Sequence, residues 1–377
     1  MQVKDRVVFM NKRRKKIKVK NLFFTILTVF LIFFCIFMLY KIFSTLKDKN
    51  TKKEDKKAVV EKKKKKAKVG EAPEIKLYGI ENTKMVKNGV YEEYGASAID
   101  KEDGDISKNI KIDNKIDNKK PGDYIVTYTV TDKDGNKAKA ERKVNVFEVK
   151  DKDTDGISVF MYHYFYDDTA GESGETSNYL AKSLFEGQLK YLSENDYYIP
   201  NMKEVNLYVE GKLDLPEKSA VLTLDDGEVS NYTIAYPLAV QYKIPLVWFV
   251  VTSWTDVSQD VQREMYNSGY TRYHSHTDNM HEGGCGEQHG GRILCVDHDT
   301  GVQDLKTSAE KLGNSDALAY PCGDTNDHAK AIVKEAGISL AFTTQPGQIH
   351  VGDEKLALSR VRINDGIGLD TFISQLK

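Results

Sequence analysis

The chain has 377 residues, enough for two domains and additional segments, and its formal net charge is only −1. That balance hides two opposite regions, because residues 1–70 hold 22 basic against 5 acidic side chains while the remainder holds 33 against 51. The acidic body argues against nucleic acid as the main partner.

An apolar stretch without charges lies near the start of the chain. It runs from Leu22 to Tyr40, and its length suits one crossing of a bilayer. The stretch lies too far from Met1, and is too long, for an ordinary cleaved signal, so we expect an uncleaved signal anchor over residues 21–43. The basic residues 1–20 would then form a cytoplasmic tail.

Lysines also follow the apolar stretch, in a linker that we assign to residues 44–71. They weaken the charge argument for orientation, so we place the body outside the cell mainly because of the activity argued below. There the linker would be an extended spacer, either without a partner or in contact with anionic wall polymers. The expected protein is therefore a single-pass membrane protein whose body faces the cell wall.

Residues 72–148 have the pattern of an all-β domain. Apolar and polar residues alternate over Tyr124–Thr131 and again after the turn sequence KDGN at 133–136, which predicts a β-hairpin. The sequence PGDYIVTYTVTDKDGN resembles the last hairpin of the small Ig-like repeats of bacterial surface proteins. The resemblance implies a β-sandwich that serves as a stalk or wall-binding module and has no catalytic function.

From residue 150 to the end, strand-like apolar runs alternate with amphipathic helical stretches. The expected strands include GISVFMYHYF, SAVLTLDD, PLVWFVVTSW, DALAYP and SLAFTT, and the expected helices include SLFEGQLKYLSEN, YPLAVQYK, VQREMYNSGY and HAKAIVKEAG. Regular βα alternation predicts a parallel sheet, and about 225 residues suit its closure into a barrel. Catalytic groups in such barrels follow the carboxyl ends of the strands.

Two polar clusters fall where strands are expected to end. Asp225 and Asp226 follow the run SAVLTL, and because adjacent carboxylates repel, a nearby cation must hold them ionised. His276 and His281, in YHSHTDNMH, are five residues apart and so do not share one helix face. With one carboxylate they make a two-histidine site typical of catalytic zinc, for which His274 is an alternative ligand.

The third cluster is the turn YPCG. Pro321 has no N–H to donate, so the first free backbone donor after this strand is that of Cys322. A donor in this position suits the negative charge that develops on a carbonyl oxygen during hydrolysis.

Taken in this order, the clusters resemble the motifs of the NodB-homology polysaccharide deacetylases, carbohydrate esterase family 4. The matching segments are Thr223–Gly227, Ser275–Thr277 with His281, and Tyr320–Gly323. The resemblance implies a distorted (β/α)7 barrel over residues 150–377 and metal-dependent removal of N-acetyl groups from amino sugars.

The resemblance also implies a role for each residue. Asp226, His276 and His281 would hold the metal, Zn2+ or another divalent ion such as Co2+. Asp225 would be the general base that takes a proton from the attacking water, and the Cys322 N–H would stabilise the oxyanion. Acetate and a free amine would be the products.

The sequence departs from the family pattern at several positions. The wider histidine spacing, with Met280 before the second histidine, resembles the branch that acts on poly-N-acetylglucosamine exopolysaccharides. An arginine common before the third motif is Ala319 here, and Arg360 and Arg362 stand where a late histidine often serves as general acid. His163 is the candidate acid in its place, with a packing role as the alternative. Cys322 also replaces a usual aromatic residue.

We therefore expect an N-deacetylase of a polymeric amino-sugar glycan, with peptidoglycan as the first choice of substrate and poly-N-acetylglucosamine as the second. A non-catalytic glycan-binding surface protein on a degenerate barrel is the alternative, and the missing arginine and general acid favour it. Cys285 and Cys295 either form a disulfide in an oxidising compartment or, with His289, a second metal site.

Overall fold

The computed structural model describes Met38, Lys41 and residues 70–254, 259–285 and 290–376. Across these residues, no helix combines the length and the apolar character that a bilayer crossing requires. The predicted tail at 1–20 lies outside the described residues, and so do the predicted anchor and linker, except for Met38, Lys41, Gly70 and Glu71.

Two small sheets pack together over residues 74–147. One contains β1 (Glu74–Leu77), β3 (Ala96–Asp100) and β4 (Gly104–Asp105), and the other contains β2 (Asn82–Val86), β5 (Lys111–Asn114), β6 (Gly122–Thr131) and β7 (Lys137–Phe147). Strands β6 and β7 pair antiparallel along their whole length, which confirms the predicted hairpin. The buried residues of their inner faces form a separate core, made of Met85, Val126, Tyr128, Val144 and Val146.

Seven parallel strands close into the predicted barrel. They are β8 (Ser158–Tyr162), β11 (Ala220–Leu224), β12 (Leu246–Val250), β13 (Thr271–Ser275), β14 (Ala317–Ala319), β15 (Leu340–Pro346) and β16 (Leu358–Arg362). The order around the barrel follows the sequence from β11 to β16, and β8 closes the ring between β16 and β11. A short parallel pair, β9 (Tyr164–Tyr166) and β10 (Tyr179–Ala181), follows β8.

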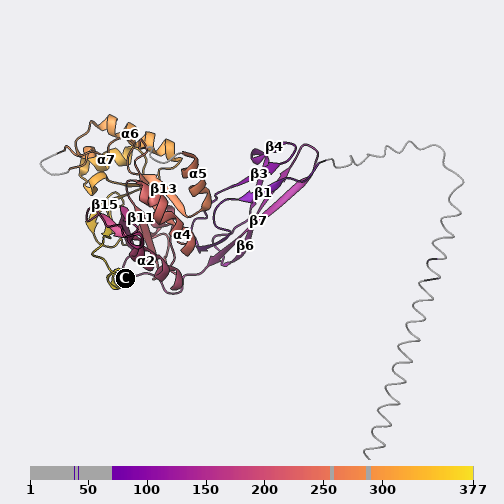
Figure 1. The fold of residues 1–377 in the computed structure, drawn as a ribbon, viewed down its shortest axis with the longest axis horizontal. Coiled ribbons are helices and arrows are strands. Elements are labelled where there is room, and N and C mark those ends of the chain that lie inside the picture. The colour runs from indigo at the N-terminus through magenta and orange to yellow at the C-terminus, as the bar shows by residue number, and fades with distance from the viewer. Residues whose placement is uncertain (1–37, 39–40, 42–69, 255–258, 286–289, 377) are drawn as a thin grey trace, which may run out of the picture. The chain divides into compact units, whose positions relative to one another are not determined.

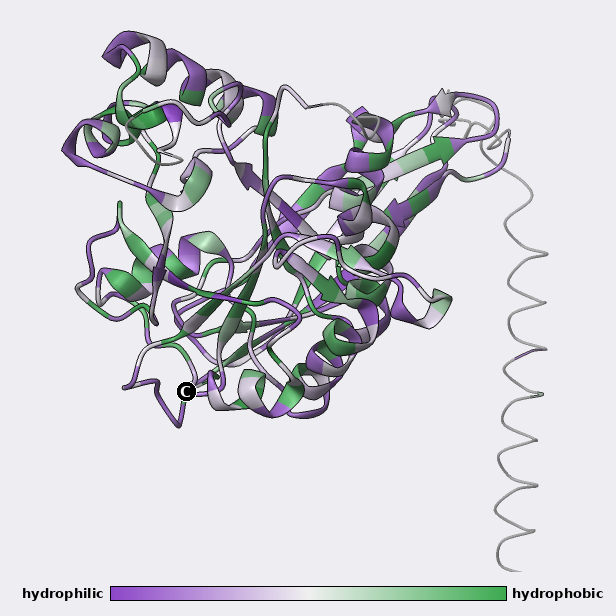
Figure 2. Cartoon of the chain, turned by 60° about the vertical axis from the view of Figure 1, so that its left-hand side comes forward, coloured by the Kyte–Doolittle hydropathy of each residue, from purple (hydrophilic) through white to green (hydrophobic). Residues whose placement is uncertain are grey.

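Helices cover the outside of the barrel (Figure 1). They are α2 (Lys182–Glu194), α3 (Met202–Val209), α4 (Tyr236–Tyr242), α5 (Gln259–Ser268), α6 (His298–Leu312), α7 (Asp327–Glu335) and α8 (Leu369–Ser374). Colouring by hydropathy shows green, hydrophobic residues concentrated along the barrel strands and purple, hydrophilic residues along the outer helices (Figure 2). This pattern is expected when strands are buried on both faces.

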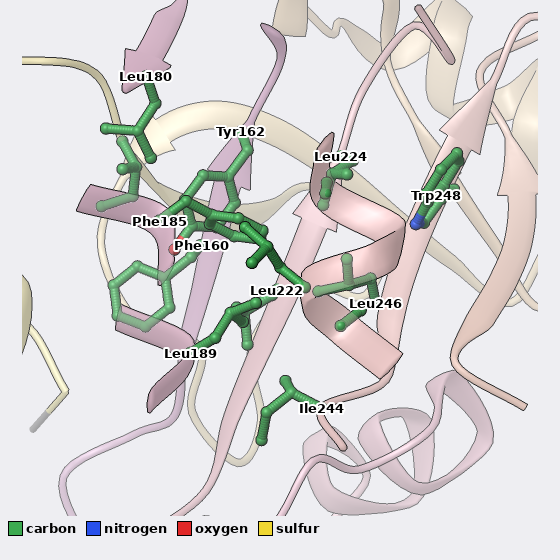
Figure 3. Close-up of a cluster of buried hydrophobic side chains, with 14 of the residues drawn as sticks. Phe160, Tyr162, Leu180, Phe185, Leu189, Leu222, Leu224, Ile244, Leu246 and Trp248 are labelled. Atoms are coloured by element: carbon green, nitrogen blue, oxygen red, sulfur yellow. The ribbon is translucent and has the colours of Figure 1, made fainter. Parts of the chain in front are cut away.

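Side chains of the barrel strands alternate between the interior and the surrounding helices. In β12, Val247 and Phe249 belong to the interior cluster, whereas Leu246 and Trp248 belong to the cluster beneath α2 and α4. Figure 3 shows side chains of this outer cluster from α2 and from β8, β11 and β12 packed together. Burying each such side chain contributes about 1.5–3 kcal/mol, so the barrel is a rigid support for the groups at its rim.

The loop between β2 and β3 contacts the barrel domain near the amino ends of the barrel strands. The Asn201 side chain donates to the Val90 carbonyl at 2.9 Å, and the Val90 N–H donates to Glu204 at 3.1 Å. At the start of β13, Arg272 forms a 2.8 Å ion pair with Glu92. These contacts leave the opposite edge of the barrel, where the strands end, for the polar clusters.

Candidate metal centre

The two adjacent carboxylates lie at the carboxyl end of β11, as predicted. Val221 and Thr223 point into the barrel, and the two-residue period of a strand puts Asp225 on the same side. The chain then turns sharply, because Asp226 has a φ of 73° and Gly227 a φ of 80°. A non-glycine residue in this left-handed conformation is strained and is held by its surroundings. Because of this turn, the carboxylates of Asp225 and Asp226 point in different directions.

Asp225 forms a buried, two-pronged ion pair with Arg360 of β16. Both distances between guanidinium nitrogens and carboxylate oxygens are 2.7 Å, and both residues are buried. Arg360 also donates to the Thr223 hydroxyl at 3.1 Å and to the Thr343 carbonyl at 3.0 Å. Burial alone would raise the pKa of Asp225, but Arg360 outweighs burial and lowers it. The expectation that only a metal relieves the repulsion between the two acids is therefore incomplete.

The sequence analysis did not identify the contact between Arg360 and the predicted base Asp225. The signal was present, since the family's arginine is replaced by Ala319 while an extra arginine appears in LALSRVRI. Leu358 belongs to the interior cluster, so a two-residue period already placed Arg360 inside the barrel. The guanidinium that contacts Asp225 thus comes from β16.

Asp226, His276 and His281 converge on one point. The Nε2 atoms of His276 and His281 lie 3.3 Å and 3.1 Å from the same oxygen of Asp226. One ligand atom from each of the three residues lies within 4.8 Å of the others. Asp226 and His276 are buried, whereas the His281 side chain is 22 % exposed, so the cluster opens on one side. The other oxygen of Asp226 accepts a 2.5 Å hydrogen bond from the Tyr164 hydroxyl.

The donor set fits a divalent metal such as zinc. His276 Nδ1 donates a hydrogen bond to the Ala319 carbonyl at 2.7 Å, and in the neutral imidazole this leaves a lone pair on Nε2 facing the carboxylate. Two electron-rich atoms at 3.3 Å repel unless a proton or a cation lies between them. Burial lowers the pKa of His276, but the carboxylates of Asp226 and Asp225 outweigh burial and raise it. Two imidazole nitrogens and one carboxylate, oriented by outer hydrogen bonds, are typical of catalytic zinc sites.

The alternative ligand His274 lies apart from this cluster. Its Nδ1 pairs with the Asn314 side chain at 3.1 Å, and its ring packs near Phe249 of the barrel interior. Burial lowers the pKa of His274 to about 3, so the imidazole is neutral at physiological pH. Its contacts indicate a packing role.

His163 directly follows β8, and the charges of Asp225 and Asp226 act on its imidazole. Its Nδ1 is buried and accepts no hydrogen bond from the described residues. Burial lowers the pKa of His163, although Asp225 and Asp226 oppose this effect. The imidazole is therefore placed near the reacting groups and has one ring nitrogen without a protein partner. Its role as the acid stays a prediction.

The third motif forms a tight turn after β14. Cys322 has a φ of 61° and a free, exposed thiol. Burial raises the pKa of the thiol, and the charges of Asp324 and Asp226 add to the effect, so the turn lies within electrostatic reach of the cluster. All three motifs thus contain a non-glycine residue with positive φ, the others being Asp226 and Thr277. Such strain is concentrated at functional sites.

Cys285 and Cys295 form a disulfide. The two sulfurs are therefore not free to bind a second metal, and His289 lies outside the described residues. The bond closes a segment that begins four residues after His281, and Arg292 N–H donates to the Glu282 carbonyl at 2.8 Å within the same region. The disulfide thus tethers the chain that carries the second histidine.

Aromatic side chains flank the opening of the cluster. Trp254 is 48 % exposed, and its ring centre lies 4.9 Å from that of His281. Tyr164 and Tyr179 pack together, with ring centres 5.1 Å apart, on the side of Asp226. Exposed aromatic rings beside a polar site offer flat apolar surfaces to a ligand.

Comparisons with known protein families agree with this architecture. Residues 75–146 match the model of a bacterial surface protein Ig-like domain, and residues 212–341 match that of polysaccharide deacetylase. These matches support the Ig-like domain and the NodB-like polysaccharide deacetylase domain predicted from the motifs.

Two individual relatives agree with the match to the polysaccharide deacetylase family. A poly-beta-1,6-N-acetyl-D-glucosamine N-deacetylase of Staphylococcus aureus is 27 % identical over 217 residues, which cover 54 % of this chain and 72 % of that protein. A protein of the same name from Staphylococcus epidermidis is 27 % identical over 220 residues, which cover 54 % of this chain and 74 % of that protein.

The fold itself resembles two solved deacetylase structures. Streptococcus pyogenes deacetylase PplD in complex with acetate has a TM-score of 0.51 and 22 % identity, covering 59 % of this chain and all of that one. IcaB from Ammonifex degensii has a TM-score of 0.52 and 24 % identity, covering 60 % and 99 %. At these identities the likeness concerns the fold.

Proposed function

We propose that this protein removes N-acetyl groups from poly-β-1,6-N-acetylglucosamine by metal-dependent hydrolysis. The observation that carries the proposal is the convergence of Asp226, His276 and His281 on one point, with the ionised Asp225 beside them. The names of the 27 % identical staphylococcal relatives support the substrate. The reaction yields acetate and a glucosamine unit.

Each residue of the site has a separate role in the proposed reaction. Asp226, His276 and His281 hold the metal, for which we propose zinc because the donors are two imidazoles and a carboxylate. When bound, such an ion would polarise the acetamide carbonyl and acidify a water molecule. Asp225 accepts the proton of the attacking water, and Arg360 keeps this carboxylate ionised.

Two further groups act on the developing charges. The Cys322 N–H, on the turn after β14, donates to the oxyanion that forms from the acetamide carbonyl. We assign the transfer of a proton to the leaving amine to His163, because the charges of Asp225 and Asp226 act on its imidazole and oppose the lowering of its pKa by burial. The amine must gain a proton when the C–N bond breaks, since an amide anion is a poor leaving group.

The first choice of substrate, peptidoglycan, is replaced here by its alternative. The relatives act by name on poly-β-1,6-N-acetylglucosamine, and the five-residue histidine spacing was already typical of that branch. Met280, the residue that widens the spacing, is buried in the cluster beneath α6 and α7. The exposed ring of Trp254 and the partly buried ring of Tyr164 beside the cluster also suit the apolar faces of sugar rings.

One of the two observations that favoured the non-catalytic alternative no longer favours it. It rested in part on the arginine missing at Ala319, but Arg360 pairs with Asp225 from another strand. A binding protein on a degenerate barrel would have no need of a buried ion pair that holds one acid ionised next to a three-residue metal cluster, because burying such a pair costs desolvation energy. An enzyme is therefore the better supported proposal.

We also propose that the body is extracellular and attached to the membrane by the predicted anchor at residues 21–43. The disulfide between Cys285 and Cys295 supports an oxidising compartment. The lysine-rich linker at 44–71 would then separate the barrel from the membrane and could lie against anionic wall polymers.

The substrate proposal is tested by incubating the purified full chain with poly-β-1,6-N-acetylglucosamine and, separately, with peptidoglycan, and measuring released acetate. We expect release from the first polymer to exceed that from the second by at least tenfold. Equal release from both polymers, or faster release from peptidoglycan, would contradict the proposal. An Asp225→Asn variant controls for contaminating deacetylases.

A further inference from the structure

The segment between the two metal-binding histidines has no helix or strand to hold it. His276 directly follows β13, and within 276–280 the chain bends at residues 276, 278 and 279 and has no regular structure at 277 and 280. Within this segment Thr277 is fully buried with a φ of 73°, a conformation that a β-branched residue adopts only when its surroundings impose it. Something outside the segment must therefore fix the relative position of the two imidazoles.

One face of helix α6 supplies the contacts that do this. Asp304, Ser308 and Lys311 are four and three residues apart, so they lie on the same side of the helix. Ser308 pairs with the Ser275 hydroxyl at 2.8 Å, and Ser275 in turn accepts the Thr277 N–H at 3.0 Å. Each of the three residues thus acts directly or through one partner on the segment.

Lys311 and Thr252 fix the next residue of the segment. Both contact the same carboxylate oxygen of Asp278, each at 2.5 Å. The backbone on the other side is bound to the end of β12, because the Ser253 N–H donates to the Asp278 carbonyl at 3.1 Å. Asp278 therefore spans the space between β12 and α6.

Asp304 makes the central contact of this face. Its two carboxylate oxygens accept the N–H groups of Asp278 and Asn279 at 2.8 Å and 2.9 Å. Two consecutive N–H groups that bind one anion in this way impose a defined backbone curvature. Without the carboxylate, the N–H groups of Asp278 and Asn279 would both lose this acceptor, and the strained turn at Thr277 would relax.

We propose that Asp304 is a positioning residue for the metal centre, which sets the distance between His276 and His281 without touching the ion. The inference rests on the proposed metal-dependent function. Asp304 belongs to α6, whereas the cluster of possible ligands consists of Asp226, His276 and His281. Outer hydrogen bonds of this kind change metal affinity by about 10–100-fold when they are removed.

The test compares metal binding by the full chain and by its variants, after removal of metal with a chelator. Zinc affinity is measured by competition with a chromophoric chelator, and the geometry of the site is measured from the visible spectrum of the Co2+-loaded protein. We expect Asp304→Ala to weaken Zn2+ binding by about 10–100-fold and to alter the Co2+ spectrum. Glu310→Ala, which removes an exposed carboxylate from the same helix, should behave as wild type.

Asp304→Asn provides a second, conservative variant. Asparagine keeps the shape and one acceptor oxygen but places an NH2 group against the second N–H, so we expect a loss of about tenfold, at the lower end of the range. If Asp304→Ala does not fold, as judged by circular dichroism, this variant decides the question. Wild-type affinity and an unchanged Co2+ spectrum in the folded variants would overturn the inference.

The outcomes also separate this inference from the proposed function. If the wild-type chain binds neither Zn2+ nor Co2+, the metal-dependent function itself fails. If the wild-type chain binds the metal and the Asp304 variants bind it equally well, only the positioning role fails.

Discussion

The ion pair between Asp225 and Arg360 gives the sharpest test of how the paired acids are tolerated. Arg360→Met keeps a long apolar side chain but leaves the buried Asp225 without its two 2.7 Å donors. Removing one partner of a buried ion pair typically lowers the free energy of unfolding by about 3–5 kcal/mol, because the remaining charge has no compensation. That is a large part of the 5–15 kcal/mol stability of a typical protein.

The loss of stability caused by Arg360→Met should depend on whether the buried partner at position 225 carries a charge. In Asp225→Asn the buried group is neutral, so adding Arg360→Met to it should lower stability by clearly less than in the wild-type background, and the difference measures the coupling. Arg360→Lys keeps the positive charge but loses the fork geometry, so an intermediate loss is expected. Urea unfolding of the five proteins (wild type, Arg360→Met, Asp225→Asn, the double variant and Arg360→Lys) at pH 7 provides the free energies.

Additive effects in this double-mutant cycle would refute the reasoning. So would a loss below about 1 kcal/mol for Arg360→Met, the magnitude of an exposed surface pair. Either result would mean that the acids are relieved mainly by the metal.

Three further predictions concern other parts of the molecule. Burial raises the pKa of Glu204 to about 7, above the value of 4.5 for an unperturbed glutamate; the folded state therefore binds this proton more tightly, and the stabilisation is present below pH 4.5 and lost as the pH rises through 7. In urea unfolding, the stability of wild type relative to Glu204→Gln should accordingly fall by about 2–3 kcal/mol between pH 5 and 8, and a constant difference would contradict this. Trp254→Ala should raise KM for the polymer severalfold and leave zinc affinity unchanged, whereas an unchanged KM would remove this ring from the substrate site. Tyr164→Phe removes the hydroxyl that donates to Asp226 and should weaken zinc binding about tenfold; wild-type affinity in a competition titration would argue that the hydroxyl is dispensable.

Much of the barrel was predictable because its strands appear in the sequence as continuous apolar runs. Runs such as SAVLTL and PLVWFV are buried on both faces and became β11 and β12, and the turn sequence KDGN gave the hairpin of β6 and β7. The convergence of the candidate metal ligands was predictable for a related reason, since Asp226 and His276 lie within two residues of the ends of strands whose carboxyl ends meet at one edge. Local sequence was sufficient to predict the position of these polar groups because each follows the end of a strand.

Contacts between distant segments were not predictable in this way. The helix α6 was missed because its sequence HDTGVQDLKTSAEKL is polar and contains Gly301, and only the structure shows Asp297 capping its first turn. Because helix α6 was not predicted, no role could be predicted for Asp304. The pairing of Asp225 with Arg360 joins residues 135 positions apart, and it depends on β16 lying beside β8 in a closed barrel. Such partners follow from topology, which a single sequence specifies only weakly.

The most direct test of the central claim is acetate release from poly-β-1,6-N-acetylglucosamine by the full chain, measured before and after metal removal. We predict that a strong chelator abolishes release, that stoichiometric Zn2+ restores it, and that Asp225→Asn stays inactive while it still binds Zn2+. Release that persists without metal, or in the Asp225→Asn variant, would contradict the account.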